Sequence, residues 1–542
     1  MNLAKYLRSP LTAYGRAIRE TPRNIICNRT LLLSALVYAL GGIPGTWDQG
    51  ASSAISSLPS FQAQFDVSSG SDAAAIRDLV SLVYIGQAIG AALSFFVNDR
   101  IGRRWSYRFY ILVWIIGQLV AILTRGWAGL YASRIICGTG IGALSVIGPL
   151  SLVEISPGEI RGLLTSWFVV FMGVGLFCGV FTVYGCYLHV APSRLQYQVV
   201  WFTPCIIMSL VASATFFLHE SPKWLIIKGR REEAIDALCA LRALPATHSR
   251  IQGEISDIEA DVAKSRAGGS NLGSILRELF TVRSNLRRLQ QTLVAYALAQ
   301  MSGANSVTSY FMPIMSILGV DGGVQRSMFL SGMYGFAKLG FSLLASFFFI
   351  DTLGRRKSLL IGISCQMLSH VYLGVFIKYH QEGPVSAAAS EAALAAVFIH
   401  AFGYAVGLLL LSYVFGGELW PNRLRSLGSA VSQTFHWIFI YAIKFSVPSI
   451  LKSMNEWGAF IFFAGWCFLG LLYVFFVVPE TSHMSTEEIS AVFEGPLFTA
   501  YRRTKRHIIE ATAVPDLGDD QSVGQSVNKA EVDQEEDKQL VR

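Results

Sequence analysis

The chain has 542 residues, of which 52% are hydrophobic and only 15% are charged. Soluble domains carry about 25% charged residues, so this composition excludes an ordinary soluble protein and favours one embedded in lipid. The net charge of +8 does not indicate a nucleic-acid-binding protein, because the basic residues gather in particular loops between apolar segments. The eight cysteines show no paired spacing, so we expect neither a disulfide framework nor a metal site.

Twelve apolar segments are long enough to be membrane helices, each of which needs about 20 mainly apolar residues. The first six are 30–58, 76–97, 106–124, 128–153, 163–188 and 199–218. The last six are 288–318, 327–350, 358–378, 391–417, 428–451 and 458–478. The sequence thus predicts an all-α membrane protein with an N-terminal six-helix bundle, 30–218, and a C-terminal six-helix bundle, 288–478.

Polar segments flank and separate these bundles. Residues 1–29 form a basic N-terminal segment, and the linker, 219–287, is expected to carry short amphipathic helices at 231–244 and 251–264. The C-terminal tail, 479–542, is expected to be partly disordered. Lysine and arginine are abundant before the first span, after the second, in the linker and after the eighth, and scarce in the opposite loops. Both termini are therefore expected to be cytoplasmic.

One carboxylate interrupts the first span. Asp48 lies within the sequence Gly45-Thr46-Trp47-Asp48-Gln49-Gly50, and its expected partner is Arg134 in the fourth span. While the pair is closed, Asp48 stays ionised; when the pair separates in an apolar cavity, burial favours the protonated acid, which is a physical basis for proton coupling. The alternatives are a static buried ion pair, or an aspartate near the outer water interface.

Two lysines also lie inside predicted spans, Lys338 in the eighth and Lys444 in the eleventh. A transport cavity at the interface between the halves would hold them near the membrane midplane, where they would attract an anionic group of the substrate. Alternatively, each side chain extends along its helix to a lipid headgroup.

Short groups of charged residues, which we call cassettes, recur in the same order in both halves. Such recurrence is expected of a transporter built from an internal repeat. We expect their arginines to pair with nearby glutamates at the cytoplasmic face, as a gate that closes the two halves when the site faces outward. The alternative is helix capping together with topology signals. The predicted gate residues are Asp99, Arg103, Arg104, Glu154, Arg161 and Glu220, with Asp351, Arg355, Arg356, Glu418, Arg425 and Glu480 in the second half.

These cassettes, together with Arg134, Gln300-Met301-Ser302-Gly303-Ala304-Asn305 and Pro479-Glu480-Thr481, resemble the sugar porter family of the major facilitator superfamily over nearly all of 30–490. The resemblance implies two six-helix bundles, alternating access and a central sugar-like site. It also places Asp48 at the position of the proton carrier of proton-coupled members, and Arg134 at that of its usual partner.

The predicted substrate site departs from the hexose pattern of that family. Amides typical of the family are replaced by Ala299, by Val169 or Phe168, and by His436, while Tyr413 replaces a tryptophan. Because a buried hydroxyl without a partner is costly, a plain hexose is disfavoured. Gln-Met-Ser-Gly at 300–303 and the basic residue at 444 look more like fungal quinate permeases, which implies a hydroxylated ring bearing a carboxylate. The residues predicted to contact substrate are Gln300, Asn305, Lys338, Tyr413, His436, Trp437 and Lys444.

The sequence therefore predicts a secondary transporter that carries a hexose, polyol or quinate in symport with protons, acting as a monomer of the plasma membrane. We expect no catalytic residues and no cofactor, and as partners only the small-molecule substrate, protons and the lipid bilayer, with no nucleic acid. Three alternatives stay open: an exporter of a small secondary metabolite, an uncoupled facilitator, and a nutrient sensor.

Overall fold

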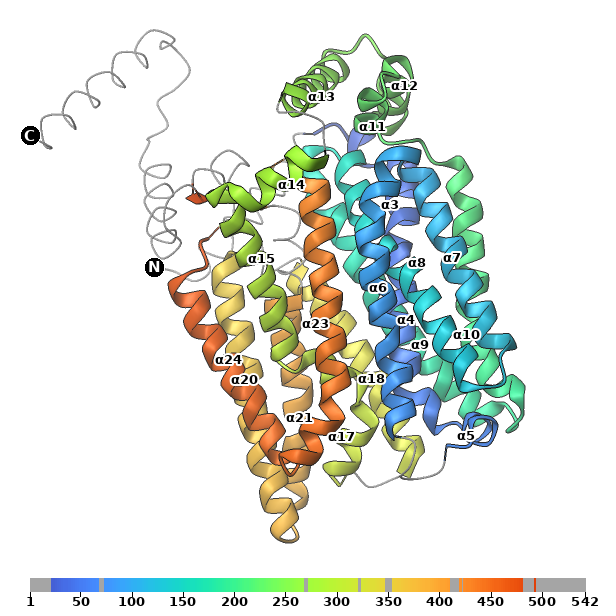
Figure 1. The fold of residues 1–542 in the computed structure, drawn as a ribbon, viewed down its shortest axis with the longest axis vertical. Coiled ribbons are helices and arrows are strands. Elements are labelled where there is room, and N and C mark those ends of the chain that lie inside the picture. Colours follow the sequence, from blue (N-terminus) through green and yellow to red (C-terminus); the bar gives the residue numbers. More distant parts are fainter. Residues whose placement is uncertain are drawn as a thin grey trace, which may run out of the picture.

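The computed structural model describes residues 21–67, 73–267, 272–319, 323–346, 353–409, 419–421, 423–480 and 492–493. Within these ranges every regular element is helical, as the sequence predicts. Figure 1 shows long helices running side by side, with the N-terminal half in blue to teal beside the C-terminal half in yellow to orange.

The first predicted span is a continuous helical path made of several pieces. After the short α2 (Arg23–Ile26), α3 (Arg29–Ala39) and α4 (Ile43–Ala54) are joined by a 3₁₀ turn at Leu40–Gly42. The remaining helices of this half are α5 (Pro59–Phe65), α6 (Ala73–Ile101), α7 (Arg103–Leu123), α8 (Trp127–Ile155), α9 (Arg161–His189) and α10 (Arg194–Ala214).

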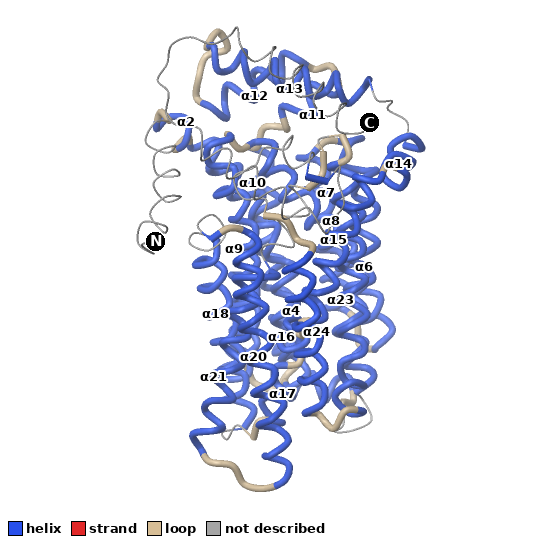
Figure 2. Tube along the Cα trace, turned by 90° about the vertical axis from the view of Figure 1, so that its left-hand side faces the viewer, coloured by secondary structure: helices blue, strands red, loops and turns tan. Residues whose placement is uncertain are grey.

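The linker and the second half continue the pattern. The linker holds α11 (Pro222–Ile227), α12 (Arg231–Arg242), α13 (Ser249–Ala267) and α14 (Leu272–Thr281), of which α12 and α13 match the two predicted short helices. The second half contains α15 (Arg283–Met301), α16 (Ala304–Ser309), α17 (Phe311–Ile317), α18 (Gly323–Leu344), α20 (Arg355–Glu382), α21 (Ala387–Tyr404), α23 (Arg425–Ser453) and α24 (Trp457–Phe476). Figure 2 shows α11, α12 and α13 lying across one end of the bundle, which we call the linker end.

Ten stretches of described residues are long and apolar enough to cross a membrane on length and composition alone. The other two predicted spans are also helical. The seventh corresponds to α15, α16 and α17, a helix broken twice and rich in arginine at its start, and the eighth corresponds to α18. Each of the twelve predicted spans therefore overlaps a helix in the described part of the chain, while 347–350 of the eighth and 410–417 of the tenth fall outside it.

Small residues bring α6 and α8 into backbone contact. A Cβ atom on Gly142 would lie 1.9 Å from the carbonyl oxygen of Gln87, and one on Gly138 would lie 2.1 Å from that of Val83. In lipid, such close approach is what lets helices gain from packing. It also places Arg134 of α8 against α6, where its Nε donates to the carbonyl oxygen of Leu79 at 2.9 Å.

The two halves meet along paired helices. α6 packs against α23, α9 against α18, and α4 against α16 and α17. Each pair joins one helix of the first half to one of the second, so a space between these pairs is bounded by both halves.

Candidate transport site

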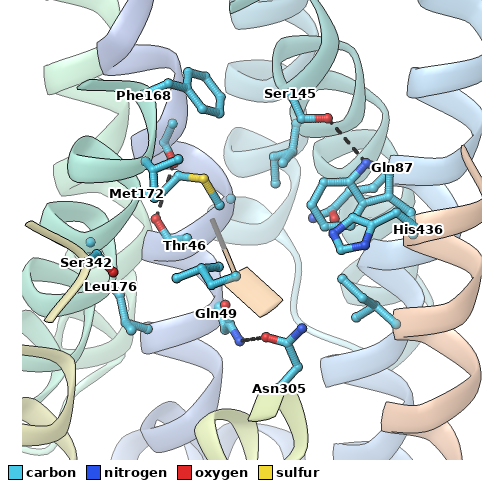
Figure 3. Close-up of a pocket in the computed structure, with 18 of the residues that line it drawn as sticks. Thr46, Gln49, Gln87, Ser145, Phe168, Met172, Leu176, Asn305, Ser342 and His436 are labelled. Atoms are coloured by element: carbon cyan, nitrogen blue, oxygen red, sulfur yellow. Dashed lines mark hydrogen bonds between the residues drawn. The ribbon is translucent and has the colours of Figure 1, made fainter. Parts of the chain in front are cut away.

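A cavity lies between the two halves and is lined by residues of both. The helices α4, α6, α8 and α9 of the first half and α16, α18, α21 and α23 of the second contribute side chains to it. Figure 3 shows Phe168, Met172, Thr46 and Gln49 on one side of the cavity and Ser145, Gln87 and His436 on the other. Polar and apolar side chains are thus interspersed around the cavity.

The structure brings most of the predicted substrate residues to this cavity. Asn305, Lys338, His436 and Trp437 line it. Gln300 lies directly behind Asn305, and Lys444 lies behind a lining tyrosine. Tyr413 falls outside the described residues, so its placement stays a prediction.

A chain of amides joins the halves at the cavity. The Nε2 of Gln49 on α4 donates to Oδ1 of Asn305 on α16 at 3.2 Å, and Nδ2 of Asn305 donates to Oε1 of Gln300 at 2.6 Å (Figure 3). The Nε2 atom of Gln300 is buried and has no hydrogen-bond partner among the described residues. That nitrogen is therefore an unsatisfied donor beside Asn305, while Gln300 itself does not line the cavity.

Asp48 and Arg134 form the predicted ion pair. They are 3% and 1% exposed, and the guanidinium binds both carboxylate oxygens, with Nη1 2.5 Å from Oδ1 and Nη2 3.2 Å from Oδ2. Nη2 also contacts Oγ of Ser52 at 2.5 Å. With the bond to Leu79, all three guanidinium nitrogens have partners, as a buried arginine requires.

This ion pair lies beside the cavity rather than in its wall. Neither Asp48 nor Arg134 lines the cavity, but Thr46 and Gln49 of the same helix α4 do. Successive residues of an α-helix point roughly 100° apart, so the carboxylate of Asp48 faces Arg134 rather than the space that Gln49 lines.

Lys338 is the cation that faces the cavity. Its side chain is 7% exposed, its Nζ donates to Oγ1 of Thr308 at 3.0 Å, and it lies 5.2 Å from the ring centre of Tyr404. Tyr404 ends α21 where a π-helical turn, Ala405–Leu409, begins. Such turns occur frequently at functional sites, because they turn side chains out of the regular helical repeat.

Lys444 is buried between the halves. It is 1% exposed, and its Nζ on α23 donates to the hydroxyl of Tyr84 on α6 at 2.5 Å while lying 4.3 Å from the centre of that ring. Tyr84 in turn lines the cavity. In the described part of the chain, neither Lys444 nor Lys338 forms an ion pair with a carboxylate.

His436 and Trp437 form an aromatic corner of the cavity. Their rings lie 4.7 Å apart, and His436 also packs 4.4 Å from the ring of Tyr296. The indole N–H of Trp437 donates to Oγ of Ser145 in the other half at 3.3 Å. This corner combines stacking surface with a contact between the two halves.

The first charged cassette is held together within its own half. Arg103 binds Glu154 through Nε and Nη2 at 2.9 and 3.0 Å, and Asp99 through Nη1 at 3.0 Å. The carboxylate of Glu220 accepts from the backbone N–H groups of Arg103 and Arg104, at 2.8 and 3.2 Å. These contacts join helices of the N-terminal half and do not bridge the two halves.

Glu220 therefore caps the N-terminus of a helix. Helix capping is the alternative to a gate that the sequence left open for this cassette. The N–H groups that it binds begin α7, and an anion is favoured at a helix N-terminus. Gly102 precedes them with φ of 93°, and a Cβ there would lie 2.6 Å from the carboxylate, so glycine is required on both counts. Burial raises the pKa of Glu220, against the opposing effect of these hydrogen bonds and of Arg103.

The second half repeats this geometry. Glu480 accepts from the backbone N–H groups of Arg355 and Arg356, at 2.8 and 3.1 Å, at the start of α20. Gly354 stands before them with φ of 87°. Asp351 and Glu418 fall outside the described residues, so the remaining pairs of this cassette stay predictions.

Two other gate residues begin helices at the linker end. Arg161 starts α9 and is exposed, and Arg425 starts α23. The acid nearest to Arg161 along the chain, Glu159, pairs instead with Arg250 of α13 at 2.8 Å. The linker thus takes part in the charge network of this end.

Several lining residues were not predicted from the sequence, chiefly Thr46, Gln49, Tyr84, Gln87, Ser145 and Tyr404. The available signal was polarity: Gln49 and Gln87 are amides inside apolar spans, where a polar group needs a reason. Which of them faces the cavity depends on the rotation of each helix. In the part of the chain that the structure describes, no cluster of histidine, cysteine and acidic residues could hold a metal ion.

Comparison with known proteins supports a transport site. A family model described as "Sugar (and other) transporter" matches residues 34–493. The chain is 29% identical over 506 residues to a probable quinate permease of Aspergillus flavus, covering 91% of this chain and 93% of that protein. It is 28% identical over 503 residues to the quinate permease of Emericella nidulans, covering 91% and 94%.

Solved structures show the same fold. The major facilitator superfamily proton:xylose symporter XylE matches with a TM-score of 0.72 and 21% identity, over 86% of this chain and 99% of that one. A partially occluded inward-open form of XylE from E. coli matches with a TM-score of 0.68 and 20% identity, over 84% and 99%. The predicted fold of two six-helix bundles is thereby confirmed.

Proposed function

Because the chain belongs to the sugar transporter family of the major facilitator superfamily, we propose that this multi-pass membrane transporter is a proton symporter for a hydroxylated ring that bears a carboxylate. Its relatives are permeases and not enzymes, and two of them are named for quinate, a compound of this chemical class. The proposal places the protein in the plasma membrane as a monomer, with both termini cytoplasmic.

The observation that carries the proposal is the buried cation Lys338. Lys338 lines the cavity. Within the described part of the chain, its Nζ atom donates to the hydroxyl of Thr308 and lies over the ring of Tyr404. A buried ammonium group without a counter-charge is costly, so an anionic ligand gains more from binding there than a neutral one. Lys444, one side chain behind the wall, adds a second positive charge.

The rest of the cavity suits a polyhydroxylated ring. Oε1 of Gln87, a lining residue, is buried without a hydrogen-bond partner among the described residues, and a substrate hydroxyl would satisfy it. The apolar side chains of Phe168, Val169 and Met172 would cover the carbon face of the ring.

Proton coupling rests on Asp48. Its carboxylate is paired with the guanidinium of Arg134, and the next residue, Gln49, contacts Asn305 of the proposed substrate site. If the halves rock and α4 turns, the ion pair opens into an apolar cavity and the acid takes up a proton. The cassettes act in this scheme as clamps that hold the helices of each half together while the halves rock.

A panel of radiolabelled glucose, inositol and quinate tests the proposal, with the purified protein in liposomes and with or without an inward proton gradient. We expect the gradient to drive accumulation of quinate and of neither neutral compound. Accumulation of glucose alone would contradict the anionic substrate, and quinate flux that ignores the gradient would contradict coupling. Efflux from loaded vesicles against a quinate gradient would instead identify an exporter.

A further inference from the structure

A break in the seventh span separates α15 from α16. The helix α15 ends at Met301, and Gly303 adopts φ of 75°, a left-handed conformation that favours glycine. A Cβ atom on Gly303 would lie 3.0 Å from Phe463 and 3.1 Å from Nε2 of His370. The surrounding helices therefore fit closely around the break.

Two buried histidines bind the carbonyl group that the break leaves free. Nε2 of His370 on α20 lies 2.8 Å from the carbonyl oxygen of Ser302, and Nε2 of His400 on α21 lies 3.2 Å from the same atom. A carbonyl oxygen only accepts, so His370 donates from Nε2. At the end of a helix such carbonyls lack their regular partner and must find another.

The two histidine rings pack against each other in the protein interior. The ring centres lie 4.4 Å apart, both side chains are fully buried, and the Nδ1 atoms have no hydrogen-bond partner among the described residues. Nε2 of Gln366 donates to Oγ of Ser302 at 3.1 Å and also lies 3.3 Å from Nε2 of His400, so His370 makes the unshared bond to the carbonyl. Neither histidine lines the cavity, so contact with substrate does not explain them.

The break determines where the substrate amides lie. Gln300 precedes it and Asn305 follows it, and the bond of 2.6 Å between them spans it. Asn305 also receives the hydrogen bond from Gln49 of the other half. Any change in the angle between α15 and α16 therefore moves both the substrate site and a contact between the halves.

We infer that His370 and His400 are positioning residues, which hold the Ser302 carbonyl and so fix the break that presents Asn305, with Gln300 behind it, to the substrate. The part of this inference that concerns substrate affinity rests on the proposed function, whereas the part that concerns the break does not. Two readouts separate them.

The first readout needs no substrate. Hydrogen exchange of backbone amides in the peptide 298–310 is compared between the wild-type protein and His370→Phe, which keeps a ring of similar size but has no donor. We expect exchange there to become about tenfold faster, the equivalent of about 1.4 kcal/mol. His370→Gln, whose amide can take the place of Nε2, should restore the wild-type rate. His380→Phe on the same helix α20, which has no contact with Ser302, is the matched control.

The second readout is the KM for radiolabelled quinate, which should rise about tenfold in His370→Phe with the maximal rate changed less than twofold, and recover in His370→Gln. Wild-type exchange in 298–310 for His370→Phe would overturn the inference. If His370→Phe does not fold, His400→Phe must show the same faster exchange in 298–310. A wild-type exchange rate in His400→Phe would then overturn the inference. Should the wild-type protein not transport quinate, the exchange result still decides the role of the histidines.

Discussion

Gln49 on α4 donates a hydrogen bond of 3.2 Å to Asn305 on α16. Gln49 directly follows the buried acid Asp48, and Asn305 lies just after the helix break at Gly303. One contact thus links Asp48, which is paired to Arg134, with the amides that face the cavity. A ligand that displaces this hydrogen bond changes the constraint on α4. In the proposed mechanism, the groups that bind the proton and the substrate are therefore adjacent, on two short helical segments.

Substitution of Lys338 is expected to separate anionic from neutral ligands. Lys338→Gln should raise the KM for quinate by about 10- to 100-fold, because a hydrogen bond to a charged group contributes about 1.5–3 kcal/mol. The methyl ester of quinate, which lacks the charge, should bind both proteins alike. Lys452→Gln, an exposed lysine on α23, is the control. Equal losses for quinate and its ester would show that Lys338 serves packing rather than charge.

Close packing of α6 on α8 is expected to tolerate no side chain at Gly142. A Cβ there would lie 1.9 Å from a backbone oxygen of α6, which cannot move without separating the helices. Gly142→Ala should leave less than about a tenth of the protein monodisperse in detergent, because overpacking of this kind costs at least 1–3 kcal/mol. Gly185→Ala on α9, where a Cβ meets nothing within 4 Å, should behave as wild type. Normal yields of Gly142→Ala would mean that the two helices are further apart.

The buried helix cap makes stability depend on pH. Burial raises the pKa of Glu220 above its ordinary value of 4.5, so the folded protein holds this proton more tightly than the unfolded chain. The stabilisation from this group is therefore present at low pH and is lost as pH rises through the raised value. Glu220→Gln cannot titrate, so the Tm of the wild type relative to this variant should fall as the pH is raised above 4.5 and through the raised pKa of Glu220.

Differential scanning fluorimetry in detergent measures this difference, with the exposed Glu232→Gln as the control for general effects of charge. A wild-type Tm that instead rises relative to Glu220→Gln over the same range would show that the cap and Arg103 outweigh burial.

The fold and the central ion pair could be predicted because their signals are local or strongly constrained. Twelve apolar segments leave few choices, and Asp48 and Arg134 are charges inside spans, where each needs an opposite partner. The contacts of the cassettes were harder to predict. Their charges are plain in the sequence, but Glu220 lies 116 residues from the N–H of Arg104 that it caps, and only the fold shows that it binds backbone rather than the other half.

The residues that line the cavity were harder still to predict. Gln49, Tyr84 and Gln87 lie on helices whose rotation is set by packing, and the hydropathy of a membrane helix carries little periodicity to reveal it. His370 and His400 gain their role only from the break at Gly303, which depends on three helices meeting there. Such relationships arise from tertiary structure and leave no spacing rule in the chain.

The central claim is that Asp48 carries the coupled proton. Asp48→Asn keeps the shape of the side chain but cannot ionise, and it leaves Arg134 without its carboxylate, so some loss of stability is expected. Ser52→Ala, which also removes a contact of Arg134 but leaves the acid, controls for that loss. Both variants are first checked for exchange of quinate across the membrane at equal concentrations.

The decisive measurement is the accumulation of radiolabelled quinate in liposomes under an inward proton gradient, compared with exchange in the absence of a gradient. The account predicts that Asp48→Asn exchanges quinate at a rate within a few-fold of wild type but accumulates none above equilibrium, whereas Ser52→Ala still accumulates it. Accumulation by Asp48→Asn equal to that of the wild type would contradict the account.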